Sequence, residues 1–126
     1  MRDFPPYAQL LRLRLDDSGD EAKIVMPFHD DVVGRPGFLH GGAIAGLLEF
    51  AAFTVLARAI GDETVRMKPV TVTVDYMRGG SEGDTFASAT IERLGRSIAN
   101  VEAFAWQSER AKPIASARLN FLLDRQ

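Results

Sequence analysis

The residues of this chain that are best placed to do chemistry lie between Gly34 and Glu49. Gly41 and Gly42 follow His40 directly and precede a long apolar run. Glycines at a helix start let a ligand approach the backbone, and the first N–H groups of a helix have no acceptor within it. These groups also lie at the positive end of the helix dipole. The segment can therefore form an oxyanion site, although a tight turn into the helix is the commoner reason for such a pair of glycines.

Glu49 stands between Leu48 and Phe50, in the middle of the most apolar part of the chain. A carboxylate is rarely buried unless it is paired, so the position predicts either a structural ion pair or a functional acid. The oxyanion site on the same helix favours the functional interpretation. A carboxylate and an oxyanion hole suffice to hydrolyse a thioester, because a thiol with a pKa of about 8.5 leaves readily as the thiolate.

The element that must carry these residues is the run 43–60, which is rich in alanine and leucine and lacks proline. It predicts a helix buried on all sides, because it is apolar around its circumference apart from Glu49, Thr54 and Arg58. Its length is borderline for a membrane span, and the two charges would be costly in lipid. We expect no membrane crossing.

Strand-like segments surround this helix. Val70, Val72, Val74 and Tyr76 alternate with polar residues in segment 68–77, and segments 85–94, 97–108 and 113–123 follow. The breaks between them are short, so neighbouring strands are predicted to be antiparallel. Residues 10–15 and 22–26 predict a hairpin before the helix. The expected fold is a single α+β domain over residues 1–126, a long helix wrapped by a curved antiparallel sheet of about six strands.

The site motif resembles that of the hotdog-fold acyl-CoA thioesterases, most closely the phenylacetate-degradation (PaaI-like) type. Their motif reads G-x-x-H-G-G, with an acid nine residues after the histidine, and Gly37, His40, Gly41, Gly42 and Glu49 match it. The likeness extends over nearly the whole chain. It implies a hotdog fold that hydrolyses acyl-CoA, with the Gly41 N–H polarising the carbonyl and Glu49 as nucleophile or general base.

Two positions depart from the family pattern. Related enzymes often carry Asn or Gln where Gly34 stands, and Ser or Thr where Phe53 stands, with Thr54 one place later. Phe53 and Thr54 remain candidate substrate-binding residues, together with Gly42 and His40. A histidine just before a helix is, however, more often a structural hydrogen-bonding group.

Arginines near strand ends and turns are candidates for binding the phosphates of CoA. We rank Arg96 first, because Gly95-Arg96-Ser97 also matches the family, and we include Arg78 and Ser97 as further candidates.

Composition excludes other kinds of site. With no cysteine and two histidines, the chain cannot build a thiolate or three-histidine metal site, and a solvated loop best explains His29-Asp30-Asp31. We expect no metal, and no cofactor beyond the CoA of the substrate. A net charge of −2 gives no attraction to nucleic acid. Residues 1–10 carry Asp3, Pro5 and Pro6 where a signal peptide needs an apolar run, so a cytoplasmic protein is expected.

The spacing of Gly41 and Glu49 predicts a site shared between two chains. Along a helix that rises about 1.5 Å per residue, they are about 12 Å apart. A carbonyl held by the Gly41 N–H is then out of reach of Glu49 in the same chain. A two-fold related copy running antiparallel brings Glu49 of one chain beside Gly41 of the other. We expect a homodimer with acyl-CoA as its small-molecule partner, and the resemblance implies that two dimers often form a tetramer.

Two other functions stay open at this stage. A non-catalytic acyl-CoA-binding protein is favoured by Gly34 and Phe53, which replace polar groups of the family site. A hotdog hydratase or dehydratase would pair a histidine with an acid near a Pro-Gly helix start. Pro36-Gly37 followed by Glu49 is faintly similar, but the spacing from either histidine does not fit.

Overall fold

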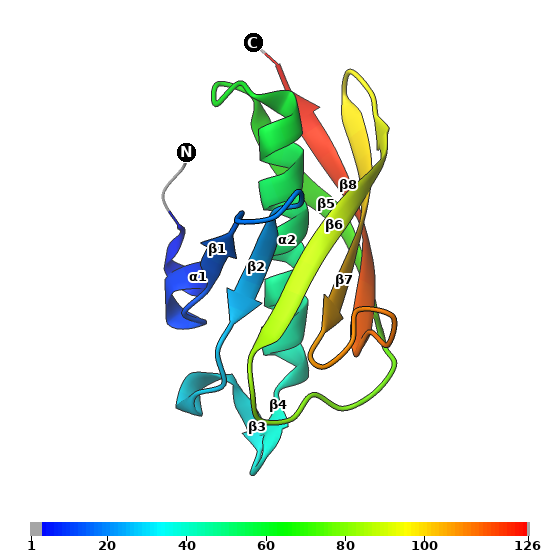
Figure 1. Ribbon diagram of the computed structural model, residues 1–126. Coiled ribbons are helices and arrows are strands. Elements are labelled where there is room, and N and C mark those ends of the chain that lie inside the picture. Colours follow the sequence, from blue (N-terminus) through cyan, green and yellow to red (C-terminus); the bar gives the residue numbers. More distant parts are fainter. Residues whose placement is uncertain (1–3, 126) are drawn as a thin grey trace.

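A single long helix, α2 (Gly41–Ile60), lies along the concave side of a six-stranded antiparallel sheet in the computed structural model, which describes residues 4–125 (Figure 1). This confirms the predicted helix wrapped by a curved sheet. The strands of the sheet are β1 (Arg14–Asp16), β2 (Lys23–Met26), β5 (Arg66–Tyr76), β6 (Thr85–Leu94), β7 (Ile98–Trp106) and β8 (Ala115–Asp124). The remaining elements are α1 (Pro6–Leu10), the 3-10 turn η1 (Asp30–Val32), and a two-stranded ribbon of β3 (Val33–Arg35) and β4 (Phe38–Leu39).

The strand order β1-β2-β6-β7-β8-β5 differs from the chain order at one point. Short breaks predicted that β5 and β6 are neighbours, but β5 pairs with β8 and forms an edge of the sheet. Residues 77–84 cross from one side of the sheet to the other at the end where α2 begins (Figure 1). Three strand spacings amount to about 14 Å, which a segment of this length spans easily.

Helix α2 begins and ends at residues suited to these places. The His40 side chain caps its N-terminus, and Gly61 ends it in the left-handed conformation with φ 69°. Its sheet-facing side is buried and includes Leu47, Leu48 and Leu56. Small side chains on the strands let the helix lie close to the sheet. They are Ala87, Ala99, Ala103, Ala105 and Ala117.

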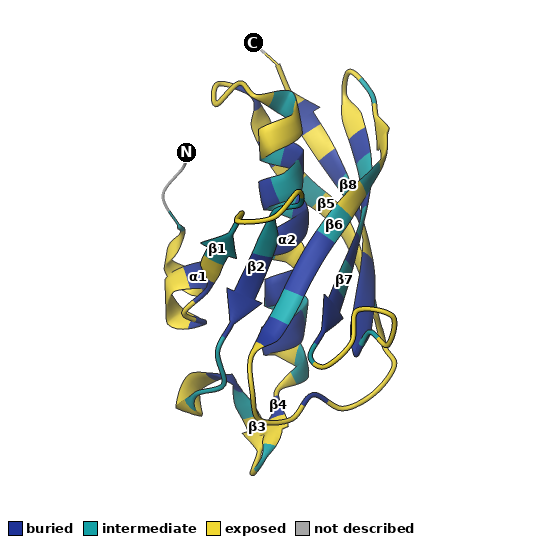
Figure 2. Cartoon of the chain, viewed as in Figure 1, coloured by how far each residue is buried: buried dark blue, intermediate teal, exposed yellow. Residues whose placement is uncertain are grey.

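The prediction that α2 is buried on all sides is wrong for the single chain. Gly42 and Glu49 are exposed on a strip of the helix that the sheet does not cover, and Arg58 is exposed on the opposite side of the helix, near its end (Figure 2). The sheet stops at the edge strand β5, and the short helix α1 covers only part of this strip. By length and apolarity α2 could cross a membrane, yet its most apolar positions pack in the core of the domain.

The edge strand β5 is largely uncovered along its outer margin. Val72 pairs with Leu119 of β8, and Val74 and Tyr76 follow on the same concave face. Val70 does not share the predicted alternation, because the register shifts between Pro69 and Thr71. Val70, Val72 and Tyr76 are 53%, 40% and 54% exposed, so this edge presents apolar side chains to solvent.

The hairpin predicted before the helix is confirmed, because β1 pairs with β2 in antiparallel fashion. Its strands are shorter than expected, and residues 6–10 before it form α1. Pro6 stands in the first turn of α1, where proline costs no hydrogen bond, and Ala8 and Leu11 are buried beneath it. Asp3, on which part of the localisation argument rested, lies outside the described residues.

Candidate active site

The start of α2 presents one backbone donor to its surroundings. The His40 Nδ1 atom accepts a hydrogen bond of 2.8 Å from the Gly42 N–H, which confirms the structural interpretation of His40. The His40 carbonyl accepts from the N–H groups of Ala43 and Ile44. The Gly41 N–H has no acceptor within residues 4–125. Of the two glycine N–H groups proposed for an oxyanion, Gly41 is therefore the one available to a ligand.

Tyr76 is a site residue that the sequence analysis did not single out. It lies at the end of β5, and its hydroxyl donates a hydrogen bond of 2.8 Å to the Gly41 carbonyl oxygen. A Cβ atom at position 41 would lie 3.4 Å from the Tyr76 ring, which is van der Waals contact, so a longer side chain there would press on the tyrosine. In the sequence, only the alternation along β5 indicated that Tyr76 lies on the side of the strand that faces the helix.

Gly34 is required by the close approach of two backbone segments. A Cβ atom at this position would lie 2.9 Å from the His40 Cα, closer than such atoms pack. The Asn or Gln that related enzymes often carry would therefore push against the residue that caps α2. Gly34 and Gly41 both line a shallow hollow of about 400 Å³ at this end of the domain.

Glu49 is exposed, which corrects the prediction that it is buried. It lies on the uncovered strip of α2, where its side chain stays in contact with water although its sequence neighbours are apolar. It lines a second, larger cavity of about 760 Å³ between α1, α2 and the strands β5 and β8. Gly41 does not line this cavity, so the two candidate catalytic residues face different hollows of one chain.

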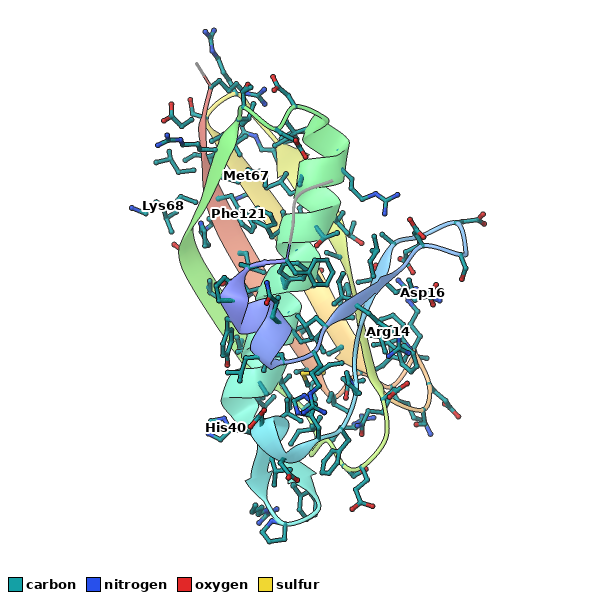
Figure 3. The ribbon with its side chains drawn as sticks, turned by 90° about the vertical axis from the view of Figure 1, so that its left-hand side faces the viewer. Arg14, Asp16, His40, Met67, Lys68 and Phe121 are labelled. Atoms are coloured by element: carbon teal, nitrogen blue, oxygen red, sulfur yellow. The ribbon has the colours of Figure 1, made fainter. Side chains whose placement is uncertain are left out.

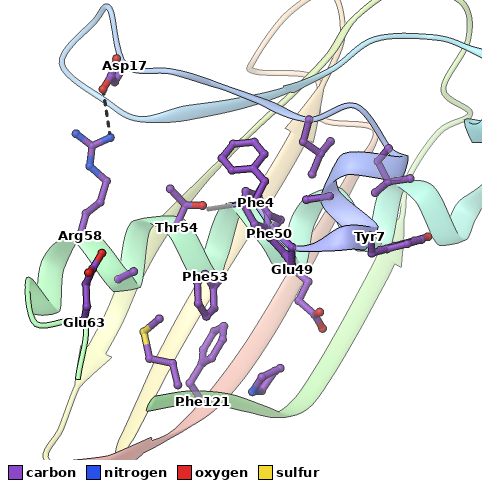
Figure 4. A pocket seen from close by; sticks show the side chains of 18 of the residues that line it. Phe4, Tyr7, Asp17, Glu49, Phe50, Phe53, Thr54, Arg58, Glu63 and Phe121 are labelled. Atoms are coloured by element: carbon purple, nitrogen blue, oxygen red, sulfur yellow. Dashed lines mark ion pairs between the residues drawn. The ribbon is translucent and has the colours of Figure 1, made fainter. Parts of the chain in front are cut away.

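The larger cavity is mostly apolar and has charged groups at one end (Figure 4). Phe53 and Thr54, both predicted substrate-binding residues, line it. Phe53 stacks on Phe50 with ring centroids 6.4 Å apart, and Phe50 meets Phe4 edge-on at 4.8 Å. Figure 3 shows His40 at one end of the domain and Met67 and Phe121, two further lining residues, towards the other end.

The arginines predicted to bind CoA lie at opposite ends of the domain. Arg78 lies two residues after the last residue of β5, at the end of the domain where α2 begins. Arg96 and Ser97 are exposed in the turn between β6 and β7, at the end where α2 finishes (Figure 1). The Arg96 carbonyl accepts a hydrogen bond of 2.9 Å from the Nε of Arg125. One chain therefore does not bring Arg78 and Arg96 together.

His29 has a structural role in this fold. Its Nε2 atom lies 3.0 Å from the Leu11 carbonyl oxygen, and its Nδ1 accepts from the Asp31 N–H at 3.3 Å. Within residues 4–125, no group of three or more His, Asp or Glu side chains could hold a metal ion. That no metal or cofactor takes part stays a prediction.

Clear pKa shifts occur away from the candidate site. Arg110 hydrogen-bonds the Glu21 carboxylate and lowers the pKa of Glu21, and the same contact raises the pKa of Arg110. The Ser18 hydroxyl and N–H, both bonded to Asp16, lower the pKa of Asp16. The Glu21–Arg110 contact joins the β1–β2 turn to the β7–β8 loop, and the Asp16–Ser18 hydrogen bonds stabilise the β1–β2 turn itself.

Comparisons with known proteins match the fold and the site segment. A family model described as the thioesterase superfamily matches residues 36–114, which include His40, Gly41 and Glu49. No curated protein sequence matches the chain.

Three solved structures are among those similar to this chain. A Bacillus halodurans protein solved with CoA is 20% identical, with a TM-score of 0.89 over 100% of this chain and 83% of its own. A Chromobacterium violaceum protein is 33% identical, with a TM-score of 0.76 over 95% of this chain and 84% of its own. A Ralstonia eutropha thioesterase, named as related to phenylacetic acid degradation, is 18% identical, with a TM-score of 0.82 over 96% of this chain and 92% of its own.

Proposed function

Because the chain belongs to the thioesterase superfamily, whose reaction is thioester hydrolysis, we propose that it hydrolyses acyl-CoA to the free acid and CoA. Its architecture is the hotdog fold. The observation that carries the proposal is the pair formed by the Gly41 N–H, which has no acceptor within residues 4–125, and the Glu49 carboxylate beside an apolar cavity. CoA as the thiol part of the substrate is supported by the Bacillus halodurans structure, which contains CoA.

The reaction needs few protein groups. The Gly41 N–H donates to the thioester oxygen and stabilises the negative charge that develops there. Glu49 either removes a proton from the attacking water, or itself attacks the carbonyl carbon and forms a mixed anhydride that water hydrolyses to the free acid after CoA has left. The C–S bond then breaks and CoA leaves as a thiolate, which needs no general acid because thiolates are stable near neutral pH. Neither a catalytic triad nor a metal ion takes part in this scheme.

The proposed site needs two chains. Gly41 and Glu49 of one chain are about 12 Å apart along α2 and line different hollows. The exposed edge of β5 carries unpaired backbone groups and the apolar side chains of Val70, Val72 and Tyr76. Antiparallel pairing of two β5 edges about a two-fold axis would satisfy this edge and make the two α2 helices antiparallel. We propose this homodimer, with two dimers forming a tetramer.

The same arrangement gives the arginines a shared role. In an antiparallel dimer, Arg96 and Ser97 of one chain lie at the same end as Gly41 and Arg78 of the other. Arg78 and Arg96 can then reach one CoA from two chains. His40 and Gly42 hold the start of α2, and Phe53 and Thr54 contact the acyl group. We propose that the protein works in the cytoplasm, without a metal or further cofactor.

The test is a panel of acyl-CoAs incubated with the purified protein and a reagent for free thiols. Release of thiol is the expected result. Loss or gain of the enoyl chromophore without thiol release would instead identify a hydratase. Saturable binding without turnover would identify a non-catalytic acyl-CoA-binding protein.

A further inference from the structure

We propose that the cavity beside Glu49 holds the acyl group and selects uncharged acyl chains, alkyl or aryl, up to about the length of a decanoyl group. This inference rests on the proposed function, because it takes Glu49 as the point where the thioester carbonyl lies. The cavity is lined by Glu49, by aromatic side chains in its middle and by charged groups at one end, and each part restricts the ligand differently (Figure 4).

The middle of the cavity is suited to a hydrocarbon. Phe50, Phe53, Met67 and Phe121 line it, and Phe121 is fully buried. Burying an apolar group against such walls is favourable in proportion to the area removed from water. A volume of about 760 Å³ is ample for a medium alkyl chain or an aromatic ring.

The short helix α1 forms one wall of the cavity, and Gly46 lets it lie there. A Cβ atom at position 46 would lie 2.7 Å from the Tyr7 Cε2 and 3.1 Å from the Leu11 Cδ1. Tyr7, Leu11 and Gly46 all line the cavity. The glycine therefore lets α1 lie against α2, where α1 covers part of the side that the sheet leaves open.

The far end of the cavity is lined by charged side chains. Arg58 lies 3.7 Å from Asp17 across this end, and Asp62 and Glu63 line it as well. Nine residues of α2 separate Glu49 from Arg58, or about 13 Å, close to the length of an extended decyl chain. A longer chain would have to pass these charges, and a terminal carboxylate would lose its hydration among the aromatic walls of the cavity, which is costly.

The first experiment measures affinity on the unaltered protein with S-alkyl-CoA thioethers, which lack the carbonyl and cannot be hydrolysed. We expect decyl-CoA to bind more tightly than methyl-CoA by about a hundredfold or more. Hexadecyl-CoA should bind no more tightly than decyl-CoA. A decyl chain ending in a carboxylate should bind about tenfold or more weakly than decyl-CoA. Equal affinity for methyl- and decyl-CoA would overturn the inference, as would equal affinity for the two decyl compounds.

A pair of variants locates the site. Ala57 lines the cavity, whereas Ala59 on the same helix is exposed and does not line it. Ala57→Phe should weaken the binding of decyl-CoA about tenfold or more and leave the affinity for methyl-CoA unchanged. Ala59→Phe should change neither affinity. Ala57→Leu adds a smaller side chain and serves as a second variant in case the Ala57→Phe protein does not fold. If the Ala57 and Ala59 variants lost the same affinity for decyl-CoA, the acyl group would not lie in this cavity.

These measurements separate the inference from the proposed function. If the thioethers show the expected trend but no acyl-CoA releases thiol, the cavity binds acyl groups and the proposed hydrolysis is wrong. If thiol is released but affinity does not depend on chain length, the hydrolysis stands and the assignment of this cavity is wrong.

Discussion

The Tyr76 hydroxyl donates a hydrogen bond of 2.8 Å to the carbonyl oxygen of Gly41, and so joins the edge strand β5 to the first residue of α2. Gly41 carries the proposed oxyanion donor, while Tyr76 lies on the edge proposed to pair with a second chain. The contact therefore links the dimer edge to the orientation of the catalytic backbone. It follows that pairing of the β5 edges would hold the oxyanion donor in place.

Replacing Tyr76 by phenylalanine removes only this hydrogen bond, because the ring that packs on Gly41 remains. A single hydrogen bond contributes about 0.5–1.5 kcal/mol, so Tyr76→Phe should lower kcat for thiol release about two- to tenfold. KM should stay unchanged, because the loss affects the charged transition state more than the bound thioester. A kcat equal to that of the unaltered protein would show that Tyr76 has only a structural role.

Glu49→Gln keeps the size of the side chain and removes its charge. We expect thiol release to fall about a hundredfold or more if the carboxylate is nucleophile or general base. Glu49→Asp should retain little activity, because the carboxylate withdraws by one methylene. Glu49 is exposed, so neither change should lower the melting temperature measured by circular dichroism. Near-full activity of the folded Gln variant would contradict the mechanism.

Gly34→Asn tests the close approach of residue 34 to His40. The added Cβ would lie 2.9 Å from the His40 Cα, so the strand β3 or the start of α2 has to move. We expect a loss of about 1–3 kcal/mol in the free energy of unfolding, measured by denaturation with urea. Gly19→Asn is the matched control, because a Cβ there meets nothing within 4 Å. If the Gly34→Asn protein were as stable as the Gly19→Asn protein, the backbone would accommodate the side chain easily.

Local patterns in the sequence predicted most of the fold. The apolar run predicted α2, and alternation predicted β5 to β8 within about two residues at each end. The order of the strands did not follow from it, because a short connection can join neighbours or cross the sheet. The helix α1 was missed because five residues carry too little periodicity, and only Pro6 in its first turn signals it.

The candidate site was predicted only in part. His40, Gly41 and Glu49 belong to one sequence motif with a definite spacing, so their positions along the helix could be predicted from the sequence. The exposure of Glu49 did not, because apolar neighbours along the sequence do not reveal that the sheet ends before covering that strip. Tyr76 joins Gly41 across 35 positions, and no local pattern carries such a contact.

Arg96→Ala should raise KM for acyl-CoA with less effect on kcat, because an arginine that contacts the phosphates binds substrate and transition state equally. The effect should shrink at high salt, since an exposed phosphate contact is screened. Arg118→Ala is the matched control, because Arg118 is exposed between Ala117 and Leu119, which face the helix, and so projects from the opposite side of the sheet. An unchanged KM in the Arg96 variant would refute its assignment to CoA.

Mixing of subunits tests whether the two chains share each site. Glu49→Gln and Gly41→Leu should each be inactive alone, the first without its carboxylate and the second with a side chain pressed against Tyr76 at the oxyanion donor. In a mixed dimer, one site combines both defects and the other combines Glu49 of one chain with Gly41 of its partner. Co-refolding the two variants should therefore recover about half the thiol release of the unaltered protein per mixed dimer.

The recovered activity depends on geometry alone, since neither variant brings a new group. If Glu49 and Gly41 of the same chain formed the site, every site in the mixture would keep one defect and no activity would return. Different affinity tags on the two variants identify the mixed dimers, and refolding each variant with itself measures the background. Mixed dimers without activity, or an active monomer, would contradict the shared site. Recovery would also support the antiparallel pairing of α2 helices, because only that arrangement brings the middle of one helix to the start of the other.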